Sequence, residues 1–267
     1  MLIYKKIIIC VVVILLLLLL LVYYVAQGSA IKYIPIPTNY TFCLPSLTCG
    51  KNIEDNKNRL YKRGVACGLG KISSSLCDNV KQEIVEWKDR ANQSMYGDIN
   101  NKDKKRYDLF MPLNGATLDV VKEMLLSWKE NGISLYNPNA TIIEVSALIT
   151  YPGAIGQRIH IDTSDKIHHK DVLSFGVFLH DVDKNLAPLA ARPANTWRPW
   201  WYSITGDKGD VYGWSAIVQH GGGANHSRDT RYVFYITILY PPLKKVDVGG
   251  YSLLPIYNNG IRVKDIV

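Results

Sequence analysis

The sequence has no concentrated block of basic residues, although its formal net charge is +8. Its lysines and arginines are spread along the 267 residues, as at Lys102, Lys104, Lys105 and Arg106. No motif of a DNA- or RNA-binding fold is present. We therefore expect a solvated basic surface and no nucleic-acid partner. An internal repeat is also absent, and 48% hydrophobic with 20% charged residues is ordinary for a globular domain.

Cysteine is scarce and poorly spaced for zinc. Of the five cysteines, Cys10 lies in the apolar N-terminal run, and the others are Cys43, Cys49, Cys67 and Cys77. The spacings C-x5-C and C-x9-C do not match the short ligand pairs of a zinc site, so disulfides are expected instead. Four cysteines in an oxidising compartment predict two disulfides, with three possible connectivities that the sequence leaves open.

Charge is absent from residues 7–31, and residues 7–26 are almost wholly apolar. A helix of about 20 such residues spans about 30 Å, the hydrocarbon thickness of a bilayer. A cleaved signal peptide is the alternative, because Gly28-Ser29-Ala30 resembles a cleavage site. The run is longer than the roughly 7–15 apolar residues of a signal peptide, so we expect an uncleaved signal anchor.

The flanking charges predict an orientation for this anchor. The pair Lys5-Lys6 precedes the run, and no such pair follows it. This asymmetry predicts a single-pass type II membrane protein. Residues 1–30 would form a cytosolic tip and the anchor, and the rest of the chain would be lumenal or extracellular. The sequons at Asn39, Asn92 and Asn139 would be open to glycosylation on that side.

The first part beyond the anchor is predicted to be helical or irregular. Residues 31–41 form an expected tether, because two prolines oppose helix formation. Residues 42–110 are the cysteine-bearing segment. The apolar spacing predicts two helices within it, over residues 53–62 and 78–90, and Asp78 or Asn79 is expected to cap the second.

Residues 111–267 are predicted to form a β domain with a supporting helix. Leu118, Val121 and Leu125 repeat at helical spacing within 116–131. Runs of β-branched and aromatic residues separated by turn residues then predict strands over 141–150, 172–179, 210–219 and 232–240. We expect a mainly β fold with flanking helices, whose core is a jelly roll.

Three separated side chains have the pattern of a non-haem iron site. His160 and Asp162 are two residues apart, so on a strand both side chains point to one face. His220 follows 60 residues later, at the end of a predicted strand. Two histidines and one carboxylate hold Fe(II) on one face of its coordination shell and leave positions open. We predict this site at His160, Asp162 and His220.

Arg231 lies eleven residues after His220 and opens the apolar run 232–240. An arginine at the mouth of a buried strand needs an anionic partner. A surface ion pair is the simpler interpretation, while the carboxylate of a co-substrate beside the iron is the functional one.

Together these residues resemble the phytanoyl-CoA dioxygenase family of 2-oxoglutarate oxygenases. The resemblance covers about residues 140–241 and includes Tyr-Pro-Gly-x-x-x-Gln157-x-x-His160-x-Asp162 and His220-(x4)-Asn225-x-Ser227-(x3)-Arg231. It implies a double-stranded β-helix, Fe(II) as cofactor, 2-oxoglutarate anchored by Arg231, and Gln157 and Ser227 near that co-substrate. Ascorbate is a possible reductant. Since the carboxylate ligand is present, the resemblance implies a hydroxylase that releases succinate and CO2.

The other histidines are weaker candidates. His168 and His169 lie in a charged stretch that is predicted to be a loop. His180 is a possible fourth metal residue, and His226 is the competitor of His220. We prefer His220 because it directly follows a predicted strand.

The substrate is left open by the sequence. The aromatic stretch 192–202 lies between the two metal motifs, where a lid is expected, and its rings either line a pocket or pack on the core. A small molecule, a lipid and a protein side chain all fit. The alternative function is a non-catalytic jelly-roll ectodomain, such as a surface or virion binding protein.

Overall fold

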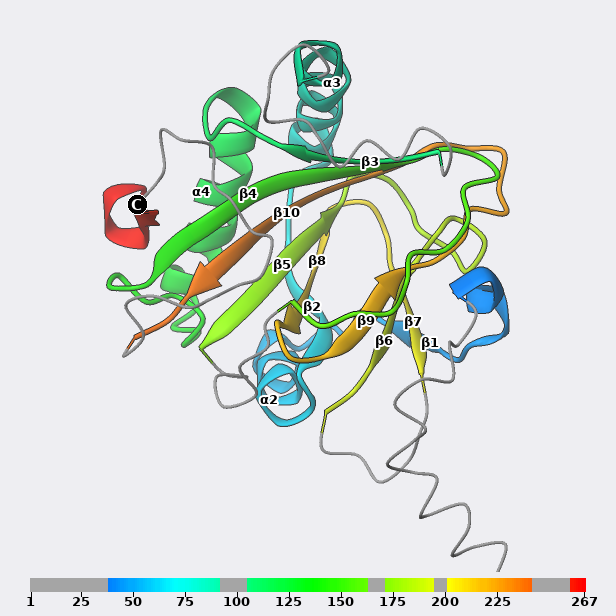
Figure 1. Cartoon of the computed structure of the whole chain (residues 1–267). Coiled ribbons are helices and arrows are strands. Elements are labelled where there is room, and N and C mark those ends of the chain that lie inside the picture. The colour runs from blue at the N-terminus through cyan, green and yellow to red at the C-terminus, as the bar shows by residue number, and fades with distance from the viewer. Residues whose placement is uncertain (1–37, 92–104, 163–170, 195–200, 242–259) are drawn as a thin grey trace, which may run out of the picture. The chain divides into compact units, whose positions relative to one another are not determined.

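The computed structural model describes residues 38–91, 105–162, 171–194, 201–241 and 260–267 (Figure 1). The predicted membrane span 7–26, most of the tether, the histidines His168 and His169, and residues 195–200 of the aromatic stretch lie outside these ranges. Within the ranges, no helix has both the length and the apolar character needed to cross a membrane.

The larger sheet is antiparallel throughout. Its strands follow the spatial order β11 (Ile261–Arg262), β4 (Thr141–Thr150), β10 (Arg231–Leu239), β5 (Val172–Phe178), β8 (Asp210–Ser215) and β2 (Val65–Lys71), and β3 (Arg106–Phe110) pairs with β4.

The smaller sheet lies beside it in Figure 1. Its order is β1 (Ser46–Thr48), β7 (Tyr202–Thr205), β6 (Leu189–Arg192) and β9 (Gln219–Gly222). From β5 onward the chain passes from the larger sheet to β6 and β7, returns to β8, crosses to β9 and returns to β10. This repeated crossing between two sheets is the chain path of a jelly roll and confirms the predicted mainly β class.

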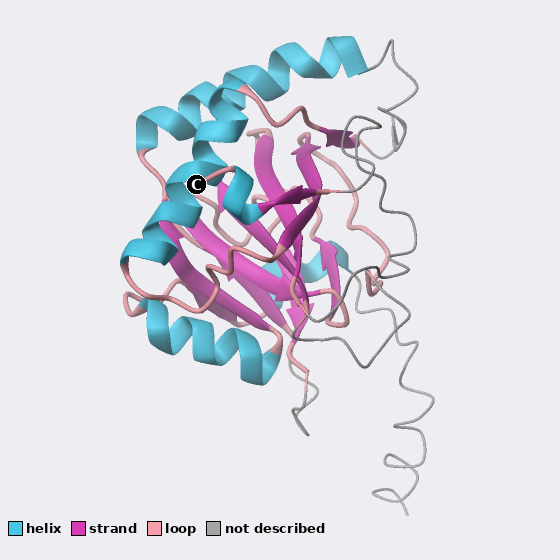
Figure 2. Ribbon diagram, turned by 90° about the vertical axis from the view of Figure 1, so that its left-hand side faces the viewer, coloured by secondary structure: helices cyan, strands magenta, loops and turns pink. Residues whose placement is uncertain are grey.

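Helices cover the outer face of the larger sheet. They are α2 (Ile53–Arg63), α3 (Ser74–Ala91) and α4 (Gly115–Glu130), and short 3-10 helices span Thr38–Cys43 and Val263–Asp265. Figure 2 shows α2, α3 and α4 on one side of the strands. Residues alternate along β10: Phe234 and Ile236 pack in the core shared with α3 and α4, whereas Val233 and Tyr235 pack between the sheets.

The helix predictions are confirmed with shifted ends. α2 and α4 lie within a residue or two of their predicted ranges, whereas α3 begins four residues before Asp78. The predicted cap at Asp78 or Asn79 is therefore wrong. The N–H of Cys77 already donates to the carbonyl of Ser73, and Glu123 accepts from the N–H of Ser73. Glu123 of α4 thus accepts a backbone N–H at the start of α3 that has no partner within that helix. The local sequence does not reveal this contact.

The predicted strand 210–219 is in fact two strands. β8 ends at Ser215, the N–H of Val218 donates to the Ser215 carbonyl at 2.9 Å, and β9 begins at Gln219. The turn moves the chain from the larger to the smaller sheet. His220 consequently faces the larger sheet from the opposite layer.

Residues 42–110 form part of the same domain. β2 pairs with β8, and β3 pairs with β4, so the segment supplies strands to the larger sheet besides the predicted helices. From β3, Arg106 donates to the Gly223 carbonyl just after β9, and Asp108 contacts Tyr235, which packs between the sheets.

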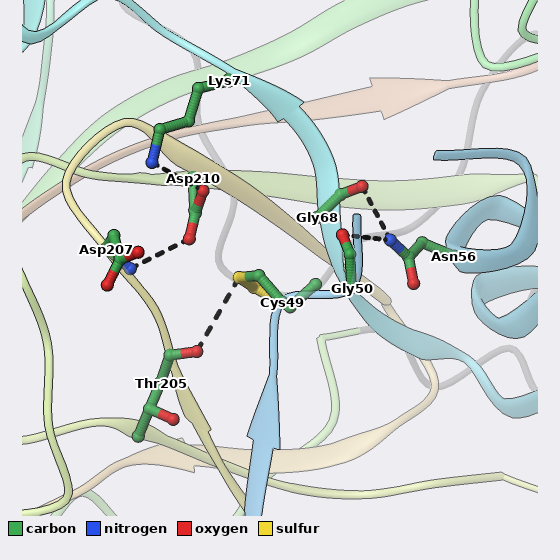
Figure 3. The surroundings of a disulfide bond; sticks show 9 residues. Cys49, Gly50, Asn56, Gly68, Lys71, Thr205, Asp207 and Asp210 are labelled. Atoms are coloured by element: carbon green, nitrogen blue, oxygen red, sulfur yellow. Dashed lines mark hydrogen bonds and ion pairs between the residues drawn. A yellow bond between two sulfur atoms is a disulfide. The ribbon is translucent and has the colours of Figure 1, made fainter. Parts of the chain in front are cut away.

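One disulfide forms within the described ranges, between Cys49 and Cys67 (Figure 3). The bond joins the end of β1 in the smaller sheet to β2 in the larger one. Beside it, the amide of Asn56 donates to the carbonyls of Gly50 and Gly68 at 2.8 and 2.9 Å (Figure 3).

The expectation of two disulfides is wrong. Cys43 is exposed and free, whereas Cys77 is free and packed in the core from α3. Burial raises the pKa of the Cys77 thiol to about 11, so it behaves as a small apolar residue. The two sulfurs cannot pair because the fold puts one outside and the other inside.

Candidate metal centre

Backbone hydrogen bonds bring the two metal motifs together. The N–H groups of His160 and His220 each donate to the carbonyl of the other at 2.9 Å, and the N–H of Asp162 donates to the Ala216 carbonyl at 2.7 Å. His160 lies in an isolated bridge rather than in a regular strand, which differs from the prediction. The two-residue spacing still directs His160 and Asp162 to one place.

The three side chains form a cluster of suitable size for a metal ion. The ligand atoms of His160, Asp162 and His220 all lie within 4.8 Å of one another. Asp162 Oδ1 is 3.5 Å from His160 Nε2 and 3.3 Å from His220 Nε2. Neighbouring ligands of an octahedral ion with bonds of about 2.1 Å are separated by about 3 Å. The cluster therefore fits iron with small adjustments.

Each histidine is oriented by its second ring nitrogen. His160 Nδ1 is 2.9 Å from the Arg158 carbonyl, and His220 Nδ1 is 2.8 Å from the Val218 carbonyl. A carbonyl only accepts, so each Nδ1 carries the proton in a neutral ring, and Nε2 keeps its lone pair for a metal.

The two histidines have shifted pKa values in opposite directions. Burial, aided by the neighbouring His220, lowers the pKa of His160. Burial also opposes the charge of His220, yet the Asp162 carboxylate outweighs it and raises the pKa of His220 above its usual range. The Asp162 carboxylate therefore stabilises positive charge on the His220 ring.

Trp214 contacts the cluster and was missed by the sequence-based prediction. Its Nε1 donates to Asp162 Oδ2 at 3.0 Å, and its ring lies 5.7 Å from the His220 ring. Trp214 is in β8, so the larger sheet contacts the metal cluster through this indole. No local signal marks it, because its partner is 52 residues away.

Arg231 is buried on the inner face of the larger sheet. It is 1% exposed, which excludes the surface ion pair considered above. Within the described residues, its Nε has no hydrogen-bond partner. Burial lowers the pKa of Arg231, and the neighbouring Tyr212 side chain only partly opposes this shift. The ring of Tyr212 stacks on that of Trp214, with ring centroids 5.7 Å apart.

Arg106 is a second buried arginine, which contradicts its predicted place on a solvated surface. It is 5% exposed. Unlike Arg231, it is well hydrogen bonded, with donation to the Gly223 carbonyl at 2.7 Å and to Thr150 Oγ1 at 3.1 Å. Burial and the charge of Arg231 lower its pKa to about 9.

Gln157 and Ser227 are hydrogen bonded within the protein. Gln157 Oε1 accepts from the N–H of Gly222 at 2.7 Å, two residues beyond His220. Ser227 Oγ donates to Asn225 Oδ1 at 2.7 Å within the loop between β9 and β10. A role beside a co-substrate remains a prediction for both.

The carboxyl groups of buried Glu144 and half-buried Asp108 both contact the phenol of Tyr235. Tyr235 Oη lies 3.2 Å from Asp108 Oδ1 and 3.1 Å from Glu144 Oε1. Burial raises the pKa of Asp108 to about 7 and that of Glu144 well above its usual range. Because Tyr235 lies 5.9 Å from the Trp214 ring, this network adjoins the residues around the metal cluster.

The remaining histidines lie apart from the cluster. The side chain of His226 is exposed, and its backbone N–H donates to the Asn185 carbonyl. His180 accepts the N–H of Tyr232 through Nε2 at 2.9 Å, so that nitrogen is committed to the backbone. Neither belongs to the group of ligand atoms around Asp162.

No protein-family model and no curated protein matches the chain. Solved structures match at low identity. AviO1 from Streptomyces viridochromogenes matches with a TM-score of 0.58 at 13% identity, over 74% of this chain and 99% of that one. EvdMO1 matches with a TM-score of 0.55 at 15% identity over 71% of this chain, which spans only 50% of EvdMO1.

SnoN, a non-heme alpha ketoglutarate (2-oxoglutarate) dependent epimerase from nogalamycin biosynthesis, matches with a TM-score of 0.56 at 13% identity, over 80% of this chain and 96% of that one. A second SnoN structure is a complex with Fe3+, alpha ketoglutarate and nogalamycin RO. The chain thus shares its fold with non-haem, 2-oxoglutarate-dependent enzymes, and its His160–Asp162–His220 cluster fits an iron ion.

Proposed function

We propose that this protein is an Fe(II)/2-oxoglutarate-dependent dioxygenase. The observation that carries the proposal is the convergence of His160, Asp162 and His220 on one point in a jelly roll. Two imidazoles and one carboxylate provide the ligand set of such an iron centre. The narrower assignment to the phytanoyl-CoA dioxygenase family rests on the motif spacing alone.

The protein residues prepare the ligand atoms. The carbonyls of Arg158 and Val218 hold the protons of the two imidazoles on Nδ1, leaving Nε2 for the metal. Asp162, 5% exposed, supplies the negative charge. When bound, iron and 2-oxoglutarate would supply an oxidant strong enough to attack an unactivated C–H bond.

Arg231 would bind the far carboxylate of 2-oxoglutarate. A buried guanidinium is costly without an anion, and its Nε is unpartnered within the described residues. A dicarboxylate would complete it with two charge-assisted hydrogen bonds. Gln157 and Ser227 remain proposed neighbours of this co-substrate.

Hydroxylation is the proposed outcome, because Asp162 retains the carboxylate ligand. The SnoN and SnoK structures are named as an epimerase and a carbocyclase, so the shared fold is compatible with other outcomes. We propose a small molecule, a lipid or a protein side chain as substrate.

We also propose that residues 7–26 anchor the enzyme in a membrane as a type II protein. The support is the uncharged apolar run after Lys5-Lys6. Glycosidase-sensitive mass at Asn39, Asn92 or Asn139 in cells would support a lumenal or extracellular domain. Protease digestion of the C-terminal domain in sealed microsomes would contradict it.

The enzymatic proposal is tested by co-substrate turnover. The purified full chain is incubated with Fe(II), ascorbate, 2-oxoglutarate and a broad substrate panel, and succinate is quantified. We expect succinate above that of an Asp162→Ala variant, because the variant lacks the carboxylate. Equal succinate from both proteins across the panel would reject catalysis and leave a non-catalytic jelly-roll ectodomain.

A further inference from the structure

We propose that Trp214 is a positioning residue that fixes which oxygen of Asp162 faces the metal. This inference rests on the proposed metal site. Asp162 Oδ1 faces both histidine Nε2 atoms, at 3.5 and 3.3 Å, whereas Oδ2 accepts the indole N–H of Trp214 at 3.0 Å. The two oxygens of one carboxylate therefore have different partners.

The backbone alone does not determine this arrangement. The bonds from Asp162 to Ala216 and between His160 and His220 fix the main chain around the cluster. The carboxylate can still rotate about its last torsion, whose preference is broad. The indole hydrogen bond selects one orientation, in which Oδ1 faces the Nε2 atoms of His160 and His220.

The indole itself has little freedom to move. Trp214 is 6% exposed, and its backbone pairs with Ser174 of β5 and Val65 of β2. Its ring lies 5.7 Å from those of Tyr212 and His220 and 5.9 Å from that of Tyr235. A donor held on a packed strand orients a metal ligand better than one on a flexible loop.

The chemistry of indole suits this role. Its Nε1–H is a donor only, so it does not compete for the metal. It is neutral, so it leaves the charge of Asp162 for the ion. Holding Oδ2 favours binding through one oxygen, which keeps a coordination position open that a bidentate carboxylate would occupy.

The test is metal binding to the full chain and its Trp214→Phe variant. Phenylalanine keeps an aromatic ring and removes the N–H. Co(II) is titrated into each metal-free protein, and the dissociation constant and visible absorption spectrum are recorded. We expect binding weakened by roughly 10–100-fold, as for other partners of metal ligands, together with a changed spectrum.

Trp128→Phe is the matched control. Trp128 in α4 is also buried, and its Nε1 donates to the Leu69 carbonyl in the core. Its replacement by phenylalanine therefore removes a comparable hydrogen bond. We expect Trp128→Phe to bind Co(II) like the wild type. Wild-type affinity and spectrum in a folded Trp214→Phe variant would overturn the proposal, as would equal weakening in both variants.

A measurement on the wild type covers the case in which Trp214→Phe does not fold. In protein labelled with 15N-tryptophan, Zn(II) is added and the indole N–H resonances are followed. The Trp214 resonance should shift more than that of Trp128, and equal small shifts would overturn the proposal. Absence of Co(II) and Zn(II) binding by the wild type would instead reject the metal site itself.

Discussion

His160 and His220 exchange a pair of backbone hydrogen bonds, each N–H lying 2.9 Å from the carbonyl oxygen of the other residue. Sixty residues separate them, yet this bridge places their rings 4.5 Å apart. The backbone pairing therefore fixes the relative positions of these two ligand residues. Preorganised ligands of this kind lose little conformational entropy on binding.

Metal affinity should fall at acidic pH. Metal ligation requires neutral imidazoles, and the Asp162 carboxylate raises the pKa of His220 above its usual range. Protons should therefore begin to compete at a pH above about 6.5, with roughly tenfold weaker binding per pH unit below the pKa. Co(II) titrations from pH 8 to pH 5 measure this. Replacing the exposed His226 by alanine should leave the profile unchanged, and a flat wild-type profile would contradict the prediction.

Arg231→Met should abolish tight 2-oxoglutarate binding without harming the fold. Methionine replaces a buried cation whose Nε is unpartnered within the described residues, so we expect equal or higher unfolding free energy in the absence of co-substrate. The dissociation constant for 2-oxoglutarate, measured by calorimetry with Mn(II) present, should rise by roughly 100-fold, or about 2.7 kcal/mol. A strongly destabilised variant would show that Arg231 has a structural partner instead.

Arg106→Met, unlike Arg231→Met, should lower the free energy of unfolding. Its guanidinium donates to the Gly223 carbonyl and to Thr150 Oγ1, and the substitution leaves these buried acceptors unsatisfied. We expect a loss of about 2–4 kcal/mol in urea unfolding. A change below about 0.5 kcal/mol would mean that water replaces the lost bonds.

Asp108→Asn should reduce the loss of stability at rising pH. Burial raises the pKa of Asp108 to about 7, above its value in the unfolded chain. The protonated carboxyl therefore favours the folded state, fully below about pH 4, and this contribution is lost as the pH rises through about 7. Asparagine does not ionise, so the Tm of the variant should fall less between pH 5 and pH 8. Asp119 is exposed, so the control variant Asp119→Asn should show the wild-type dependence of Tm on pH. Parallel Tm curves for all three proteins would contradict the raised pKa of Asp108.

Removing the disulfide should destabilise the domain. Cys49 and Cys67 close a loop with a sequence separation of 18, for which chain entropy predicts about 3 kcal/mol. Cys49→Ser should lower the Tm, whereas the exposed Cys43→Ser should not. Reductant should lower the Tm of the wild type and leave that of Cys49→Ser unchanged. Insensitivity of the wild type to reductant would indicate that the bond does not form.

The sequence by itself determined the helices and strands that have a regular spacing of apolar residues. It also determined which residue types make up the metal site. Helix α4 and strands β4, β5 and β10 follow from local apolar spacing and turn residues, which act over a few residues. The set His160, Asp162 and His220 was recognisable because metal coordination restricts residue type and short-range spacing.

Only the tertiary structure decided which side chains support those residues. The turn after Ser215 splits a predicted strand, Trp214 finds Asp162 across 52 residues, and Arg106 is buried against carbonyls more than 100 residues away. Cys77 points into the core while Cys43 remains outside, so only one disulfide forms among the described residues. Burial and pairing of this kind depend on which strands become neighbours, and local sequence patterns carry no information about that choice.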